Sequence, residues 1–562
     1  MDADIPPTKR FRGNEVESSA IQNNGSLDGV GVDGEVEEAG ISDDILKALD
    51  DVDTGPLDEK AAKKLILALE KAVLRNQEQR IKFADEPAKF MESEVELNTA
   101  IQEIHALATA PSLYGLLIDL NAVETLLQLL SHDNTDIVVA VVSLLQELTD
   151  IEDRPEEGEE DEEAEDPGRR FAQALVDWGG GQLMASLVRA LERLDDSDGS
   201  SDEADGVHNA MALVENLVDL VGEPVCAAAS SSATSGATSE GSGSGHNSLV
   251  NWLMKRVKRR GALDDNKVYA GELLGVLVQN TDRVRKALGQ LDGIDTLLQC
   301  LAAFKKHDPA TAGEREHMEN LFDCLCAALS LQSNRTRFLD GEGVQLMNLM
   351  LREKKESRFG ALKVLDHATS GQGGGPNCDK LVDILGLRTL FPLFMKTPSK
   401  KRRGADRTAQ EVEEHVLAVV GALLRSCSEA NRARVLTKFA ENDHAKLDRL
   451  VELHFVYADR VARFDKLHTS SEESDEGGEQ RLVERLDAGM FTLQLIDQIL
   501  ADVCLHGVAS IRQRASKLLS LKGDSFASVS DVLKQYASNL GEEASAEKKR
   551  VLSMTSKLRE LQ

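Results

Sequence analysis

Apolar residues in the middle of the chain recur at spacings of three and four, which is the periodicity of an α-helix with one buried face. The segment 318–329 has this spacing, and the polar residues at 332–334 then indicate a turn. Two similar segments follow at 343–350 and 362–368, and the pattern starts again at Gly386 after a glycine-rich break. We interpret this stretch as helix, turn and helix, repeated.

Each unit begins with a short motif, a small or polar residue followed by apolar residues. It occurs at Asn121, Gly181, Gly293, Gly343 and Gly386, and the last three are separated by steps of 50 and 43 residues. These steps are close to the roughly 40 to 47 residues of armadillo and HEAT repeats. Such a repeat buries its apolar face only by stacking on its neighbours. We therefore predict an all-α, right-handed helical solenoid of the armadillo or HEAT type.

The same pattern divides the chain into four parts. Residues 1–55 are poor in large apolar groups, and we predict that they form a disordered acidic tail. We expect an N-terminal helical, HEAT-like cap over 56–120, armadillo repeats over 121–456 and a C-terminal helical cap over 457–562.

Four polar stretches interrupt these helical parts. The first, 152–168, holds eleven acids in fifteen consecutive positions; 195–206 is acidic and rich in serine; 227–247 is a Ser, Ala, Gly and Thr tract; and 469–480 is an acidic linker. We predict solvated, disordered insertions at all four. The first could instead act as a decoy for basic peptides. The serines of the second lie in a context that acidophilic kinases favour, so a phosphoprotein is among the expectations.

The composition agrees with stacked helices, because 41% of the residues are hydrophobic and only 4% are aromatic. The formal net charge of -32 repels nucleic acid backbones and favours basic partners, so we expect no direct nucleic acid binding. Seven scattered cysteines argue for a reducing compartment. The longest apolar runs, such as Val416 to Leu424, are too short to span a bilayer, so we expect a soluble intracellular protein without membrane contact.

Catalytic and cofactor motifs are not found in the sequence. The glycine-rich segment 371–376 lacks the lysine of a phosphate-binding loop. Cys324 and Cys326 would lie about 200° apart on a helix, so they cannot face one metal together. We therefore predict a protein that is not an enzyme and that has no metal or cofactor.

A solenoid usually binds an extended partner along its concave surface, so candidate site residues are polar positions on apolar helices. Amides can hold a peptide backbone, and carboxylates can pair with Lys or Arg. The alternative is that these positions are simply solvated. The candidate peptide-binding residues are Asn209, Glu215, Asn216, Asp219, Asn320 and Asp323.

Three basic clusters stand out in this acidic chain. Lys9, Arg10, Phe11 and Arg12 follow two prolines and resemble a short nuclear localisation signal, although a chance cluster is the alternative. The cluster 255–260 is best interpreted as a solvated helix end, where cations suit the helix dipole. The cluster 400–403 lies in a predicted loop. It could contact phosphate, including that of RNA, or serve as an import signal.

Several long, non-repetitive strings resemble the beta-catenin-like protein 1 family, and the resemblance extends over roughly 56–536. The strings are Arg80–Phe83, Lys89–Glu94, Ser131–Asp136, Leu144–Asp150, Glu203–Asn209, Glu319–Asp323, Gly341–Lys355, Leu362–Ala368, Asp383–Arg388 and Arg485–Gly489. The insertions at 152–166 and 227–245 look longer than the family pattern.

This resemblance implies a nuclear armadillo protein of the spliceosome, acting in mRNA processing within the complex named after the nineteenth pre-mRNA processing factor. It also implies binding of basic nuclear localisation signals, notably those of the Myb-domain cell-division-cycle-5-like factor, and the capacity to form a homodimer. Our leading hypothesis is a non-catalytic scaffold that binds basic segments in an acidic groove. The alternative is an importin-alpha-like transport adaptor, which would need a separable basic arm.

Overall fold

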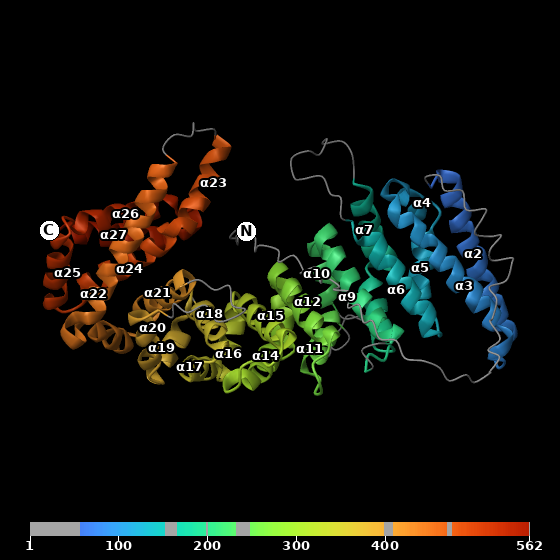
Figure 1. Ribbon diagram of the computed structural model, residues 1–562, viewed down its shortest axis with the longest axis horizontal. Coiled ribbons are helices and arrows are strands. Elements are labelled where there is room, and N and C mark those ends of the chain that lie inside the picture. The colour runs from blue at the N-terminus through green and yellow to red at the C-terminus, as the bar shows by residue number, and fades with distance from the viewer. Residues whose placement is uncertain are drawn as a thin grey trace, which may run out of the picture. The chain divides into compact units, whose positions relative to one another are not determined.

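A computed structural model describes residues 57–151, 166–197, 201–231, 248–371, 373–397, 409–468 and 475–560. All of them belong to the compact unit from Leu57 to Gln562. Within these ranges every regular element is a helix, and neighbouring helices pack on one another in chain order (Figure 1). The predicted all-α solenoid is therefore confirmed.

In the described ranges, six units of three helices form the central part of the protein. The first helices are α4 (Tyr114–Asp119), α7 (Pro167–Asp177), α10 (Glu223–Ser230), α13 (Asp282–Gln290), α16 (Gln332–Asp340) and α19 (Gly375–Asp383). The second helices are α5 (Ala122–Leu129), α8 (Leu183–Leu191), α11 (Leu249–Lys258), α14 (Gly293–Leu301), α17 (Gly343–Glu353) and α20 (Leu387–Met395). The third helices, which we call the ladder helices, are α6 (Thr135–Thr149), α9 (Asp202–Val221), α12 (Asp265–Asn280), α15 (Ala312–Ala328), α18 (Ser357–Thr369) and α21 (Ala409–Ser426).

Longer helices flank these units at both ends. On the N-terminal side are α2 (Glu59–Lys82) and α3 (Met91–Ile104), and α3 packs on α6. The C-terminal helices are α22 (Glu429–Leu467), α23 (Asp475–Arg485), the π-helical turn η6 (Leu486–Met490), α24 (Phe491–His506), α25 (Ala509–Leu521), α26 (Phe526–Asn539) and α27 (Ser545–Arg559). Short 3-10 turns are η1 (Pro87–Lys89), η2 (His105–Thr109), η3 (Pro111–Leu113), η4 (Trp178–Gly180), η5 (Ala302–Lys305) and η7 (Glu542–Ala544).

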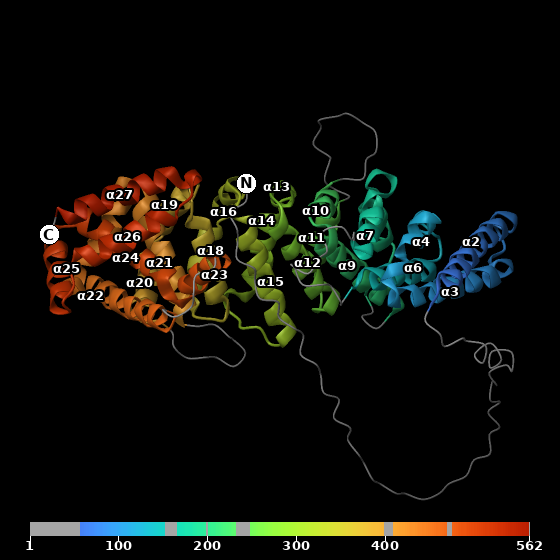
Figure 2. The same ribbon diagram turned by 90° about the horizontal axis from the view of Figure 1, so that it is seen from above.

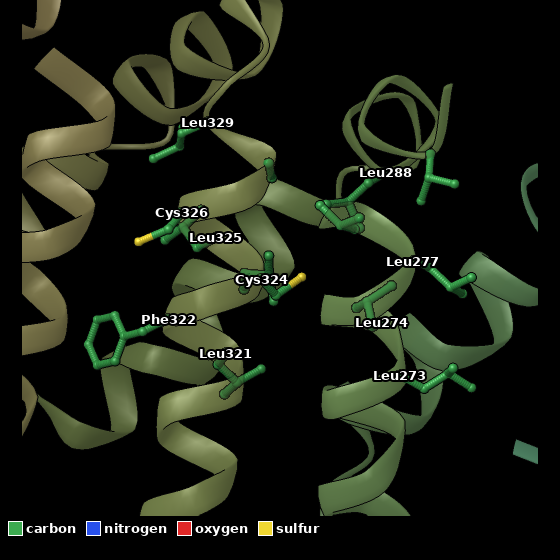
Figure 3. Packing of buried hydrophobic residues seen from close by; sticks show 14 of the residues in the cluster. Leu273, Leu274, Leu277, Leu288, Leu321, Phe322, Cys324, Leu325, Cys326 and Leu329 are labelled. Atoms are coloured by element: carbon green, nitrogen blue, oxygen red, sulfur yellow. The ribbon is translucent and has the colours of Figure 1, made fainter. Parts of the chain in front are cut away.

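The core of the stack lies between successive ladder helices. Leu274 of α12 faces α15, which contributes Leu321 and Leu325 among others, whereas the buried Leu273 and Leu277 point to the other side of α12 (Figure 3). Each ladder helix packs on the one before it and the one after it. A buried apolar side chain stabilises the fold by about 1.5–3 kcal/mol, so these repeated contacts hold the units in register.

Glycine allows the closest approach between ladder helices. A Cβ atom at Gly360 in α18 would overlap the ring of Phe322 in α15, and a Cβ at Gly206 in α9 would come within 2.7 Å of Val139 in α6. Real Cβ atoms do not approach so closely, and only glycine permits this packing without displacing a neighbour.

The predicted helix, turn and helix pattern is wrong in one respect, because each unit has three helices. Residues 332–334, predicted as a turn, are the first turn of α16, and the glycine-rich break at 371–376 runs into α19. The reason is that α16 buries only Asn334 and Phe338. A helix with so few buried residues gives almost no apolar periodicity.

Helices also extend into the predicted insertions. Helix α7 begins at Pro167 inside 152–168, and α9 begins at Asp202 inside 195–206. Helix α10 continues to Ser230 inside 227–247, and α23 begins at Asp475 inside 469–480. The side chain of Ser201 accepts a hydrogen bond from the backbone N–H of Ala204, so an N-cap starts α9 where composition alone indicated a loop. Most of the remaining positions of these insertions lie outside the described residues.

Buried asparagines join consecutive units. Asn334 is fully buried, and its Nδ2 donates hydrogen bonds to the carbonyl oxygens of Arg285 in α13, at 2.9 Å, and Ala328 in α15, at 3.0 Å. Asn377 holds the corresponding place in α19 and donates to carbonyl oxygens of α16 and α18. A single side-chain amide thus donates to two backbone carbonyl groups of the preceding unit, one at the end of its ladder helix and one in its first helix.

We expect Asn334→Leu to lower the free energy of unfolding by about 2 kcal/mol, because two buried carbonyl groups lose their donor. The matched control is Asn280→Leu at the exposed end of α12, where the amide bonds only to its own helix. That change should cost less than about 0.5 kcal/mol. Urea denaturation followed by circular dichroism measures both, and equal midpoints for the two variants would contradict the bridging role.

Candidate functional site

The ladder helices present polar side chains opposite their buried leucines. In α12, Tyr269 and Glu272 are three residues apart and lie on one side, whereas Leu274 and Val278 are buried on the other. The helices on either side of α12 add Glu215 in α9 and Glu316 in α15. We call the surface carrying Glu215, Glu272 and Glu316 the acidic face.

The carboxylates of the acidic face lie close enough for their charges to interact. The Tyr269 hydroxyl donates a hydrogen bond of 2.5 Å to Oε2 of Glu215, and its ring centroid lies 4.8 Å from that of His208. Burial raises the pKa of Glu272, and the negative charges of Glu215 and Glu316 raise it further. No ion pair joins Glu272 or Glu316 to a cation within the described part of the chain. A cation placed here would relieve the mutual repulsion.

Further along the ladder, at α15, α18 and α21, the carboxylates are mostly paired with the protein's own cations. Asp323 accepts a 2.7 Å hydrogen bond from Nζ of Lys363, and Oδ2 of Asp366 lies 3.0 Å from Nδ1 of His415. Glu414 in α21 differs, because burial raises its pKa and Thr492 supplies its hydrogen bond at 3.3 Å. The charge available to a basic partner therefore lies on α9 and α12 and on Glu316 near the start of α15.

Four of the predicted site residues lie on α9, but they do not share one role. Glu215 belongs to the acidic face, and Asp219 lies exposed in the last turn of the helix. Asn209 is half-buried. The amide of Asn216 donates at 3.2 Å both to the carbonyl of Gln146 and to the hydroxyl of Thr149, so it joins α9 to α6 and is not open to a peptide.

The other two predicted residues lie on α15. Asn320 is half-buried next to Gly271 of α12, and its Nδ2 has no hydrogen-bond partner among the described residues. Asp323 is already paired with Lys363. The predicted import signal at 9–12 and the basic loop at 400–403 lie outside the described residues.

The cluster 255–260, interpreted above as a solvated helix end, is only partly so. Arg256 is 5% exposed; its guanidinium pairs with Asp196 at 2.6 Å and with Asp264 at 2.5 Å. The prediction is wrong for this residue, because the acids that bury it lie 60 residues before it and 8 residues after it in the chain.

Tyr269, Glu272 and Glu316 were not among the site residues predicted from the sequence. Helix 265–280 is apolar apart from its ends and the pair Tyr269 and Glu272, so polar residues three apart on an apolar helix were the available signal. What the sequence could not give is the proximity of Glu272 to Glu215 and Glu316, which depends on how neighbouring ladder helices align.

The described ranges hold no group of three or more His, Cys, Asp or Glu side chains placed to bind a metal ion. One helical stretch, Gln480–His506, is long and apolar enough to cross a membrane, but 78% of its apolar window is buried inside the protein. That burial is typical of a core helix in a folded domain.

Comparison with known proteins places the chain in a family. The family described as "Catenin-beta-like, Arm-motif containing nuclear" matches residues 43–534. Beta-catenin-like protein 1 of Bos taurus and of Homo sapiens are each 49% identical over 513 residues, covering 89% of this chain and 86% of those proteins. The beta-catenin-like protein 1 homolog of Schizosaccharomyces pombe is 29% identical over 485 residues, covering 85% of this chain and 79% of that protein.

Among solved structures, an engineered protein that is 15% identical aligns with a TM-score of 0.42, covering 87% of this chain and 99% of that one. The family match spans all six three-helix units and both flanking helical regions up to α26. The armadillo-type units of the structure and the Arm motif in the family's description agree. The chain therefore belongs to the family of catenin-beta-like, Arm-motif-containing nuclear proteins.

Proposed function

We propose that the protein is a non-catalytic nuclear scaffold of pre-mRNA splicing that binds basic, nuclear-localisation-type segments of splicing factors along the acidic face. The observation that carries this proposal is the set of carboxylates Glu215, Glu272 and Glu316 on three successive ladder helices. Glu272 and Glu316 have no cation partner in the described ranges, and the pKa of Glu272 is raised by burial and by the other two charges.

The physical argument is that Lys and Arg side chains of a peptide would supply the missing positive charge. An extended peptide rises about 3.3 Å per residue, and packed helices lie about 8–10 Å apart, so alternate or every third side chain can meet successive ladder helices. The net charge of -32 adds long-range attraction for basic segments.

The nuclear location is supported by the family's description as nuclear. The splicing context rests on the resemblance of the sequence strings to the beta-catenin-like protein 1 family. The proposed partners are proteins of the nineteen complex, above all the Myb-domain cell-division-cycle-5-like factor. Self-association into a homodimer remains a prediction of the same resemblance.

The test is a fluorescence anisotropy titration of the full chain with Lys/Arg-rich peptides from the Myb-domain factor at low and at high salt. We expect saturable binding that weakens as salt is raised, because exposed charges are screened over about 8–10 Å at physiological ionic strength. Binding that is equally strong at both salt concentrations, or no binding at either, would contradict a charge-driven acidic face.

Deletion of residues 1–55 distinguishes the scaffold hypothesis from the transport-adaptor hypothesis. Unchanged peptide binding together with unchanged nuclear delivery of the peptide cargo supports the scaffold, because the tail then carries nothing that transport needs. Retained peptide binding with lost delivery of cargo would instead favour the adaptor, whose basic arm would have to lie at Lys9–Arg12.

A further inference from the structure

A cavity of about 520 Å³ lies at the junction of α11, α12, α14 and α15, apart from the acidic face. These four helices pack on one another in pairs, and Figure 2 labels them side by side in the middle of the stack. The end of α11 and the segment after it supply Lys258, Arg259 and Arg260, and α12 supplies Lys267. Four cationic residues thus line one cavity in a protein whose net charge is -32.

The positive charge of this cavity is only partly neutralised. Arg259 pairs with Asp196 at 2.5 Å, and Nζ of Lys267 donates a 2.8 Å hydrogen bond to the carbonyl of Arg259. Lys258 and Arg260 are exposed and make no ion pair within the described ranges. The one carboxylate of the lining, Glu314, accepts a 2.6 Å hydrogen bond from the backbone N–H of Ala310 and keeps its negative charge, but the four cations outnumber Glu314 and Asp196 together. The cavity therefore offers free positive charge to an anion.

A buried polar side chain without a partner also belongs to this cavity. His317 of α15 lines it and is only 6% exposed; its Nδ1, which has no hydrogen-bond partner among the described residues, lies on the side of Gly271 in α12. Burial and the charge of Lys267 lower the pKa of His317 to about 4, so its ring is neutral at physiological pH. A neutral imidazole can donate one N–H to a bound oxygen.

Apart from Gln299, the rest of the lining is mostly apolar and includes Leu263, Ala303 and Phe304. Cations beside an apolar surface suit a ligand with one compact anionic group and an adjoining hydrocarbon part. RNA would need cations along an extended track, and the acidic surroundings would repel its other phosphates. A phosphorylated side chain in a peptide has the required form, since its phosphate carries nearly two negative charges and three acceptor oxygens.

We propose that this cavity binds a phosphoserine or phosphothreonine side chain of a partner polypeptide, with Lys258, Arg260 and Lys267 facing the phosphate and Phe304 next to a flanking residue. The site is separate from the acidic face, so the protein has one surface for basic segments and one cavity for a phosphorylated segment. Either can fail without the other.

Cys300 gives the cavity an internal reporter. Its thiol lines the cavity and is partly exposed, whereas Cys427, also partly exposed, lies outside it. The other five cysteines are buried. We expect a random-flank phosphoserine peptide pool, and N-acetyl-phosphoserine amide at higher concentration, to slow alkylation of Cys300 in the full chain while leaving Cys427 unchanged. Peptide mass spectrometry measures both rates in one sample, and the unphosphorylated pool should protect neither thiol.

The matched variants are Lys258→Gln and Lys255→Gln, two lysines in the last turn of α11 of which only Lys258 lines the cavity. Lys258→Gln should weaken protection of Cys300 by about tenfold in ligand concentration, as expected for loss of one charge-assisted contact. Lys255→Gln should leave it unchanged. The ratio of rates with and without ligand is compared within each variant, because burial raises the pKa of the Cys300 thiol and the charges of Lys267 and Lys258 oppose that rise.

The proposal is overturned if phosphoserine ligands protect Cys300 no better than their unphosphorylated forms, or if Lys255→Gln weakens protection as much as Lys258→Gln. A single-stranded RNA oligonucleotide serves as the third arm. Stronger protection by RNA than by the phosphopeptide pool would overturn the assignment to a polypeptide.

Discussion

Replacing His454 by leucine is expected to lower the free energy of unfolding by about 3–5 kcal/mol, because the change leaves a buried carboxylate without its partner. His454 in α22 and Asp497 in α24 are 2% and 0% exposed, and 2.6 Å separates Nδ1 of the histidine from Oδ1 of the aspartate. On the other side of the ring, Nε2 lies 3.6 Å from Oδ2 of Asp524. The ring thus joins two carboxylates, and neither finds an equivalent partner once it is removed.

The effect should depend on pH in a defined direction. Burial lowers the pKa of His454, but the charges and hydrogen bonds of Asp497 and Asp524 outweigh it, so the pKa stands above its ordinary value. A group with a raised pKa in the folded state stabilises the fold fully below its unfolded pKa of about 6.5 and loses that contribution as the pH rises through the folded value. The difference in stability between the parent protein and His454→Gln should therefore be larger at about pH 6 than at about pH 9.

Urea denaturation of four proteins tests this account. His506→Leu is the matched control, since His506 also pairs with an aspartate, at 2.7 Å, but is 41% exposed; it should cost less than about 1 kcal/mol. The double variant His454→Leu/Asp497→Leu should recover much of the loss, because no unpaired charge remains. If His454→Leu lowers the free energy of unfolding no more than His506→Leu does, the buried pair of His454 and Asp497 does not make the predicted contribution to stability.

The second large effect is expected for Glu272→Lys, which should weaken binding of a basic peptide by at least about tenfold at low salt. The change puts a cation between Glu215 and Glu316, where the peptide's own cation would lie. The new lysine would pair with these two carboxylates and should not destabilise the fold. Anisotropy titration measures the affinity, and thermal unfolding checks that the variant is folded.

The control for Glu272→Lys is Glu192→Lys, the same charge change at the exposed C-terminal end of α8, which is a second helix. This variant should keep the affinity within about twofold, because only the long-range field changes. An equal loss in both variants would show that the net charge, and not the acidic face, governs binding.

The sequence predicted the ladder helices well, since segments such as 318–329 have long apolar periodicity. It could not predict α16, because a helix that buries only Asn334 and Phe338 depends on the neighbouring units for its stability. The same limit applies to the site. Glu215 and Asp323 were visible as polar positions on apolar helices, but whether a carboxylate is paired depends on residues such as Lys363, which lies 40 positions away.

The basic cluster at 255–260 shows this limit most clearly. A run of cations after an amphipathic helix is typical of a solvated helix end. The fold instead buries Arg256 between two aspartates and turns Lys258 and Arg260 toward a cavity that the sequence does not reveal. Local pattern predicts which helices form, whereas the side-chain environment depends on contacts between units.

The pairing of each ladder helix with the one before and the one after it has an evolutionary consequence. In such a row, residues added to a loop between helices lie outside every helix pair, so an insertion leaves the packing unchanged. The segments between α6 and α7 and between α10 and α11 can therefore vary in length, whereas the segment between α8 and α9 has to keep Asp196, which pairs with the buried Arg256. Lineages can alter the first two of these connections freely and still inherit the same stack.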